Sequence, residues 1–102
     1  MVTKSAKRLA PIHPGEVLQD LLQEAGLTVN ALALALRVPA NRIGSIIKGQ
    51  RGITADTALR LARYFGTSAQ MWMNLQAKYD LEATEDAIGR KVEREVLPRS
   101  AA

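Results

Sequence analysis

The hydrophobic positions of the chain recur every three or four residues in five separate stretches, a spacing that predicts five short α-helices. Each stretch has one apolar stripe and one polar face, which is typical of helices that pack around a common core. The predicted helices cover residues 14–25, 29–36, 40–48, 55–65 and about 68–79. In the fourth, for example, the stripe consists of Ala58, Leu61, Ala62 and Phe65.

Residues that start and stop helices stand at the ends of these stretches. Thr28 and Thr54 precede the second and fourth stretches and are good N-caps. Pro14 suits the first position of a helix because it has no N–H to leave unpaired, and Gly26 favours the left-handed backbone that ends one. The only histidine, His13, stands at a helix entrance between prolines, so we expect a structural role for it.

The stretch from Leu27 to Arg51 contains two of the predicted helices and a tight turn between them. Its apolar residues form the two inner stripes, whereas its outer residues are hydrogen-bond donors or cations. The outer residues are Asn30, Asn41, Arg42, Ser45, Lys48, Gln50 and Arg51. Residues 25–55 include four basic residues and no Asp or Glu. Because a cationic, donor-rich face suits a polyanion, we interpret this stretch as a helix-turn-helix that reads DNA.

Two terminal segments lie outside the helical pattern. Residues 1–11 form a basic arm with Lys4, Lys7 and Arg8, which we expect to be flexible; whether it also touches DNA is left open. In the C-terminal extension, residues 82–102, Thr84 is able to cap a further helix, interrupted by Gly89 and ended by Leu97-Pro98. The extension either docks on the core or binds another protein, and the pattern does not decide between these two.

Composition narrows the class of protein. A chain of 102 residues rich in Leu and Ala, with few β-branched residues, favours one all-α domain. Without cysteine there are no disulfides and no thiolate chemistry, which fits a cytoplasmic protein. Its apolar runs are too short to cross a membrane, and its N-terminus lacks a signal core. The net charge of +4 is unevenly placed, because residues 80–86 hold four acidic residues and no basic one.

Several local patterns, in order along residues 12–81, carry a family resemblance. They are Pro11-Ile12-His13-Pro14-Gly15-Glu16, Val38-Pro39, Asn41-Arg42-Ile43, Gly49-Gln50-Arg51-Gly52-Ile53-Thr54, Asp56-Thr57-Ala58-Leu59-Arg60-Leu61, Phe65-Gly66-Thr67-Ser68, Trp72, Asn74-Leu75-Gln76 and Tyr79-Asp80-Leu81. In this ordered set the chain resembles the HigA (VapI-like) antitoxins, which are Xre-type, phage-repressor-like DNA-binding proteins.

The resemblance implies a five-helix helix-turn-helix domain over residues 12–81 that forms a homodimer. It also implies a repressor of its own operon that binds and silences a RelE-like HigB toxin, an mRNA-cutting ribonuclease. This second role comes from the resemblance alone. Two other readings stay open: a stand-alone Xre-family regulator without a toxin, and a protein-binding adaptor that does not bind an operator.

Three sets of candidate functional residues follow. We expect the third helix to place Ala40, Asn41, Arg42 and Ser45 in the major groove, since its isoleucines face inward. The expected phosphate contacts are Thr28, Asn30, Arg37, Lys48, Gln50 and Arg51. The expected dimer interface is Met71, Trp72, Leu75 and Tyr79, although an apolar stripe at helical spacing is usually part of the core and the two roles are compatible. The expected DNA is a palindromic operator.

Other classes of function are disfavoured. One histidine, no cysteine, no carboxylate pair and no glycine-rich phosphate loop leave no catalytic site, metal site or cofactor site to assign. RNA binding is disfavoured because no aromatic platform lies on the basic face. One local feature is unusual, since Arg37 occupies a turn position where many helix-turn-helix sequences have glycine. A side chain there costs on the order of 1 kcal/mol if the backbone is left-handed.

Overall fold

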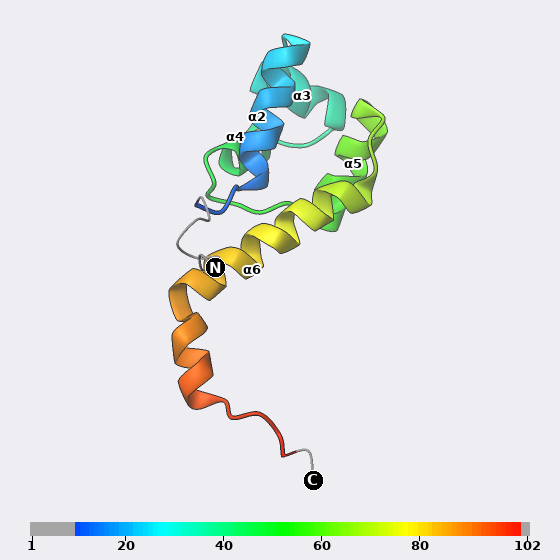
Figure 1. Cartoon of the computed structure of the whole chain (residues 1–102). Coiled ribbons are helices and arrows are strands. Elements are labelled where there is room, and N and C mark those ends of the chain that lie inside the picture. Colours follow the sequence, from blue (N-terminus) through cyan, green and yellow to red (C-terminus); the bar gives the residue numbers. More distant parts are fainter. Residues whose placement is uncertain (1–9, 101–102) are drawn as a thin grey trace.

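Figure 1 shows the computed structural model, which describes residues 10–100. These residues form five helices and no strand, which confirms the predicted all-α class. The helices are α2 (Pro14–Ala25), α3 (Val29–Leu36), α4 (Ala40–Ile47), α5 (Ala55–Phe65) and α6 (Ala69–Glu95). No helix in this range is long and apolar enough to cross a membrane. Most of the predicted N-terminal arm lies outside the described residues.

Side-chain caps fix where the helices begin. The hydroxyl oxygens of Thr28, Thr54 and Ser68 each accept a hydrogen bond from the backbone N–H three residues on, at 3.0–3.4 Å. Helix α2 uses His13 instead, whose Nδ1 accepts from the Gly15 N–H at 2.9 Å. The Glu16 carboxylate in turn accepts from the His13 N–H at 3.2 Å. The structural role expected for His13 is therefore confirmed.

The core lies where the five helices meet. It consists of Leu18, Leu22, Leu32, Ala33, Leu36, Ile43, Ile46, Ile53, Ala58, Leu61 and Trp72. Every helix contributes to it, but α6 does so only near its N-terminal end, through Trp72. The apolar stripes that predicted the helices are thus the surfaces that hold α4 in place.

The prediction that the fifth helix ends near Tyr79 and that Thr84 caps another one is wrong. Helix α6 continues without a break through Thr84 and Gly89 to Glu95. A glycine inside a helix costs only about 1 kcal/mol relative to alanine. Its neighbours 85–95 are mostly Glu, Arg, Lys and Ala, which are good helix formers, so the helix persists. It ends before Leu97, whose backbone Pro98 pushes out of the α region.

The distal half of α6, from Leu81 to Glu95, does not dock on the core. It projects away from the other helices (Figure 1), and Leu81, Ile88 and Val92 on it are 42–64% exposed. Of the two outcomes that the sequence left open, docking on the core is therefore excluded for residues 82–95.

The turn between α3 and α4 is left-handed at Arg37, with φ 63° and ψ 43°. Arg37 is the one non-glycine residue with positive φ among residues 10–100. Its N–H donates to the Leu34 carbonyl at 3.2 Å, and the N–H of Val38 donates to the Ala33 carbonyl at 3.0 Å, so the turn is well bonded. The expected backbone cost at this position is therefore present in the folded protein.

Replacing Arg37 with glycine is expected to stabilise the fold by somewhat less than about 1 kcal/mol, because relief of strain is partly offset by the larger entropy of glycine in the unfolded chain. Thermal unfolding followed by circular dichroism should show a midpoint higher by ~2–5 °C. Arg37→Ala removes the same charge but keeps the Cβ, which causes the strain, so it should show no such gain. A glycine variant that melts below the alanine variant would contradict the assignment of strain.

Candidate nucleic-acid interface

Helix α4 presents a polar side opposite its buried isoleucines. Ile43 and Ile46 are fully buried, and at about 100° per residue Asn41, Ser45 and Lys48 come to the opposite side of the helix. Ala40 and Arg42 lie at the two edges of that side. All four residues predicted to contact bases, Ala40, Asn41, Arg42 and Ser45, are thus brought together on α4. Ala40 and Asn41 are exposed, whereas Arg42 and Ser45 are half-buried.

The six residues predicted to contact phosphates are all exposed: Thr28, Asn30, Arg37, Lys48, Gln50 and Arg51. Thr28 and Asn30 lie at the start of α3, where unpaired backbone N–H groups favour anions. The Thr28 hydroxyl oxygen already accepts the Ala31 N–H at 3.0 Å, so its phosphate contact would be made by donation. The structure therefore places these residues where ligands can reach them, on three separate segments.

The basic loop after α4 is held by α6. The Ile53 N–H donates to Gln76 Oε1 at 2.7 Å, and Gln76 Nε2 donates to Asp80 Oδ1 at 2.9 Å. The Gln76 amide also packs on Gly52, where a Cβ would lie 3.0 Å from it. In the sequence, Gln76 is only part of the Asn74-Leu75-Gln76 pattern, which does not indicate this contact. Gln76 fixes the end of the segment that carries Gln50 and Arg51.

An ion-pair network joins α4 to α5. Asp56 Oδ1 accepts hydrogen bonds from Arg60 Nε at 2.6 Å and from Arg42 Nη1 at 3.1 Å. Arg60 Nη1 also donates to the Leu36 carbonyl at the end of α3, at 2.9 Å. The hydrogen bond from Arg60, followed by the one from Arg42, lowers the pKa of Asp56 below its usual value. Asp56 is therefore ionised at neutral pH.

Sequence reasoning did not find this network. Residues 25–55 contain no acid, but Asp56 is the next residue along the chain and the fold places it against Arg42. The i,i+4 spacing of Asp56 and Arg60 could have indicated an ion pair within α5. No local signal connects either residue to Arg42, because that contact depends on how α4 and α5 pack.

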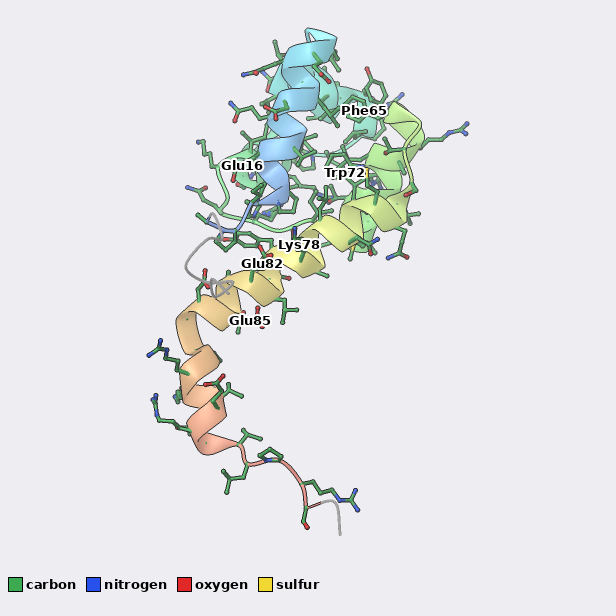
Figure 2. The ribbon with its side chains drawn as sticks, in the orientation of Figure 1. Glu16, Phe65, Trp72, Lys78, Glu82 and Glu85 are labelled. Atoms are coloured by element: carbon green, nitrogen blue, oxygen red, sulfur yellow. The ribbon has the colours of Figure 1, made fainter. Side chains whose placement is uncertain are left out.

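The four residues predicted for the dimer interface have different environments. Trp72 has no exposed surface. Its side chain lies among the helices (Figure 2), and its indole N–H donates to Thr67 Oγ1 at 3.1 Å. Met71, Leu75 and Tyr79 are half-buried, and the Tyr79 ring packs edge-on against His13. The prediction that Trp72 belongs to the core is therefore confirmed. Because Trp72 has no exposed surface, it is not available for a subunit interface.

No group of three or more His, Asp or Glu side chains able to hold a metal ion occurs among the residues that the structure describes. The hollow between α3 and α5 is shallow and lined by Ala35, Leu36, Leu59, Arg60 and Tyr64, among others. It contains no arrangement of nucleophile, base and orienting group.

Comparison with known proteins places the fold in a family. A helix-turn-helix family model matches residues 18–72. Virulence-associated protein I of Dichelobacter nodosus is 57% identical over 75 residues, which cover 72% of this chain and 69% of that protein.

Two solved structures are also similar to the chain. The HigA antitoxin of Pseudomonas aeruginosa, solved with the higBA promoter, is 50% identical with a TM-score of 0.85, and the match covers 88% of this chain and 99% of that one. A HigA-family addiction module antidote protein of Coxiella burnetii is 47% identical with a TM-score of 0.84, over 89% of this chain and 100% of that one. The chain belongs to the HigA (VapI-like) antitoxins of the Xre-type helix-turn-helix family.

Proposed function

We propose that the protein is a sequence-specific DNA-binding repressor and the antitoxin of a HigBA-like system. The observation that carries this proposal is the exposed polar side of α4, on a fold that a relative uses in a complex with the higBA promoter. Binding and transcriptional control need no covalent chemistry, and the protein is not an enzyme. It acts in the cytoplasm, where bacterial DNA and a cytoplasmic toxin are both present.

The side chains of α4 have the chemistry to read base edges. Asn41 can make paired hydrogen bonds to adenine, and Arg42 can make them to guanine or hold a phosphate. Ser45 can donate or accept, and Ala40 can touch a thymine methyl group. The phosphate set on the flanking segments fixes the position of α4 without reading sequence. Specificity thus comes from α4, and affinity comes largely from the surrounding cations.

A homodimer would repeat this interface on a palindromic operator. A two-fold axis would place the two copies of α4 about 34 Å apart, which is one turn of B-DNA. The half-buried apolar side chains Met71, Leu75 and Tyr79 on α6 are the remaining candidates for the subunit interface. We propose residues 12–81 as the DNA-binding unit and residues 82–102 as an extension, with the boundary falling inside α6.

The antitoxin role makes a prediction about partners. Relatives named as antitoxins support a toxin as the second partner, and the family resemblance implies that it is a RelE-like HigB toxin. Co-purification with the product of an adjacent gene tests this. A stand-alone regulator would bind its operator but retain no such protein. An adaptor without operator binding would retain the protein but shift no promoter fragment in a gel assay.

Removal of the Arg42 side chain tests the DNA interface. Arg42→Ala is expected to weaken binding to the preferred operator by ~10-fold or more and to relax base preference at one position in each half-site. The fold should persist, because Asp56 keeps Arg60 as its partner. Measured affinities for the operator, its single-base variants and a scrambled duplex check this. If Arg42→Ala bound all of them as the wild type does, the assigned face of α4 would be wrong.

Lys48→Ala separates phosphate contacts from base contacts. Because a phosphate contact carries no sequence information, affinity should fall by the same factor for operator and scrambled duplex. The slope of log K against log salt concentration should become shallower by about 1 for each DNA-bound subunit. A loss confined to the operator would instead assign Lys48 to base reading.

A further inference from the structure

Helix α5 is bonded to both helices of the helix-turn-helix through one pair of side chains. Arg60 reaches the carbonyl of Leu36 at the end of α3, and Asp56 reaches Arg42 on α4. The hydrogen bond between Arg60 and Asp56 closes the chain of contacts. Three helices are thereby linked at the edge of the side of α4 that faces the proposed DNA.

The network restrains Arg42 before any DNA arrives. An arginine side chain has many rotamers, and ordering it on binding costs entropy. In this protein Arg42 Nη1 is already directed to Asp56, and the Arg42 side chain is 28% exposed. A guanidinium has five N–H donors in one plane, so a single bond to Asp56 leaves donors for a base edge.

A carboxylate at this place has a cost. Asp56 is ionised, and a negative charge beside a polyanion lowers affinity for every DNA sequence alike. Such a residue does not increase the affinity of the protein for DNA as a whole. It is useful if it improves the difference between the correct and incorrect base pair, because specificity is a difference of affinities.

We propose that Asp56, held in turn by Arg60, is a positioning residue that sets the base preference of Arg42. This inference rests on the proposed DNA-binding function and deepens it. Asp56 itself touches no base; it holds one nitrogen of the Arg42 guanidinium, which restricts the directions in which the remaining donors point. Arg60 holds the Asp56 carboxylate near the end of α3, because it also donates to the Leu36 carbonyl. The direction of the Arg42 side chain therefore depends on the geometry of the turn between α3 and α4.

Two variants that change the net charge in opposite directions test the proposal on the full chain. Asp56→Asn removes the negative charge, so affinity for scrambled DNA should rise about 3-fold or more. Arg60→Gln removes a positive charge, so affinity for scrambled DNA should fall. Both should reduce discrimination about 10-fold at the base pair where Arg42→Ala loses its preference, and leave the other positions unchanged. Glu93→Gln, on the distal half of α6, is the charge control for Asp56→Asn.

The measurement uses the preferred duplex selected by the wild type from a random-sequence pool, its single-base-pair variants and a scrambled duplex. If Asp56 only repels DNA, Asp56→Asn tightens all of them by one factor and discrimination is retained, which overturns the proposal. Retained discrimination in Arg60→Gln, or an Arg42→Ala variant that relaxes no position, also overturns it. If the wild type itself does not distinguish the selected duplex from the scrambled one, it is the proposed function that fails. Unfolding midpoints check that each variant is folded.

Discussion

Gly15→Ala is expected to destabilise the protein by about 3 kcal/mol or more. A Cβ built on Gly15 overlaps the backbone carbonyl oxygen of Ile46 and lies 2.8 Å from its carbonyl carbon. It would also lie 3.0 Å from the Cα of Ile47. All three atoms belong to the backbone of α4, so no side-chain rotation relieves the overlap. Helix α2 would have to move away from α4, opening the core around Leu18.

This loss is large because the total free energy of unfolding of such domains is only about 5–15 kcal/mol. Urea unfolding should show the midpoint shifted strongly downward, and the melting temperature should fall by ~10 °C or more. Gly89→Ala is the matched control, because its nearest atom outside the helix backbone is the Glu85 Cβ at 3.9 Å. It should stabilise α6 by up to about 1 kcal/mol. A Gly15→Ala variant as stable as the wild type would contradict the close α2–α4 contact.

This contact also concerns function. The overlap at Gly15 is with the C-terminal end of α4, the helix proposed to enter the major groove. A folded Gly15→Ala protein with displaced α4 would lose base discrimination even though every proposed contact residue is present. Catalytic and binding constellations tolerate displacements of about 0.5 Å or less, so a shift of α4 is a sensitive readout.

Helix α2 was predicted correctly from local signals at both ends, Pro14 at its first position and Gly26 after its last residue. Helix α3 follows from Thr28 as its cap and from its stripe, and its bounds are those expected. Helix α6 has no strong stop signal before Pro98, so the boundary predicted near Tyr79, with Thr84 as the cap of a further helix, is absent. Local rules identify strong starts and stops, whereas a weak stop is overridden by the residues around it.

The candidate site could be predicted only in part, because local sequence signals do not show which residues of other helices pack beside it. The polar side of α4 follows from the spacing of Ile43 and Ile46, since one helix determines it. The neighbours of that side, Asp56 and Gln76, come from other helices and depend on tertiary packing. Sequence therefore predicted the residues that face the proposed DNA, but not the residues that hold them in position.

Trp72→Ala is the second substitution with a large expected effect, a loss of about 3–5 kcal/mol. Trp72 has no exposed surface, and it is the buried residue through which α6 joins the core. Removing its indole leaves a large cavity at the junction of α6 with the other helices (Figure 2) and an unpaired Thr67 hydroxyl. Trp72→Phe keeps most of the buried ring but loses the hydrogen bond to Thr67, so its cost should be only about 1–2 kcal/mol.

The dependence on protein concentration distinguishes a core residue from an interface residue. If Trp72 supports the core of its own chain, Trp72→Ala loses stability even under conditions where the protein is monomeric. If it belonged to a subunit interface, the variant would dissociate while each monomer stayed folded. Chemical unfolding at two protein concentrations, together with molar mass from light scattering, separates these cases. Leu81→Ala, an exposed apolar residue on the same helix, is the control and should change stability by less than about 0.5 kcal/mol. A folded, monomeric Trp72→Ala protein with unchanged stability would return Trp72 to the interface and require a different anchor for α6.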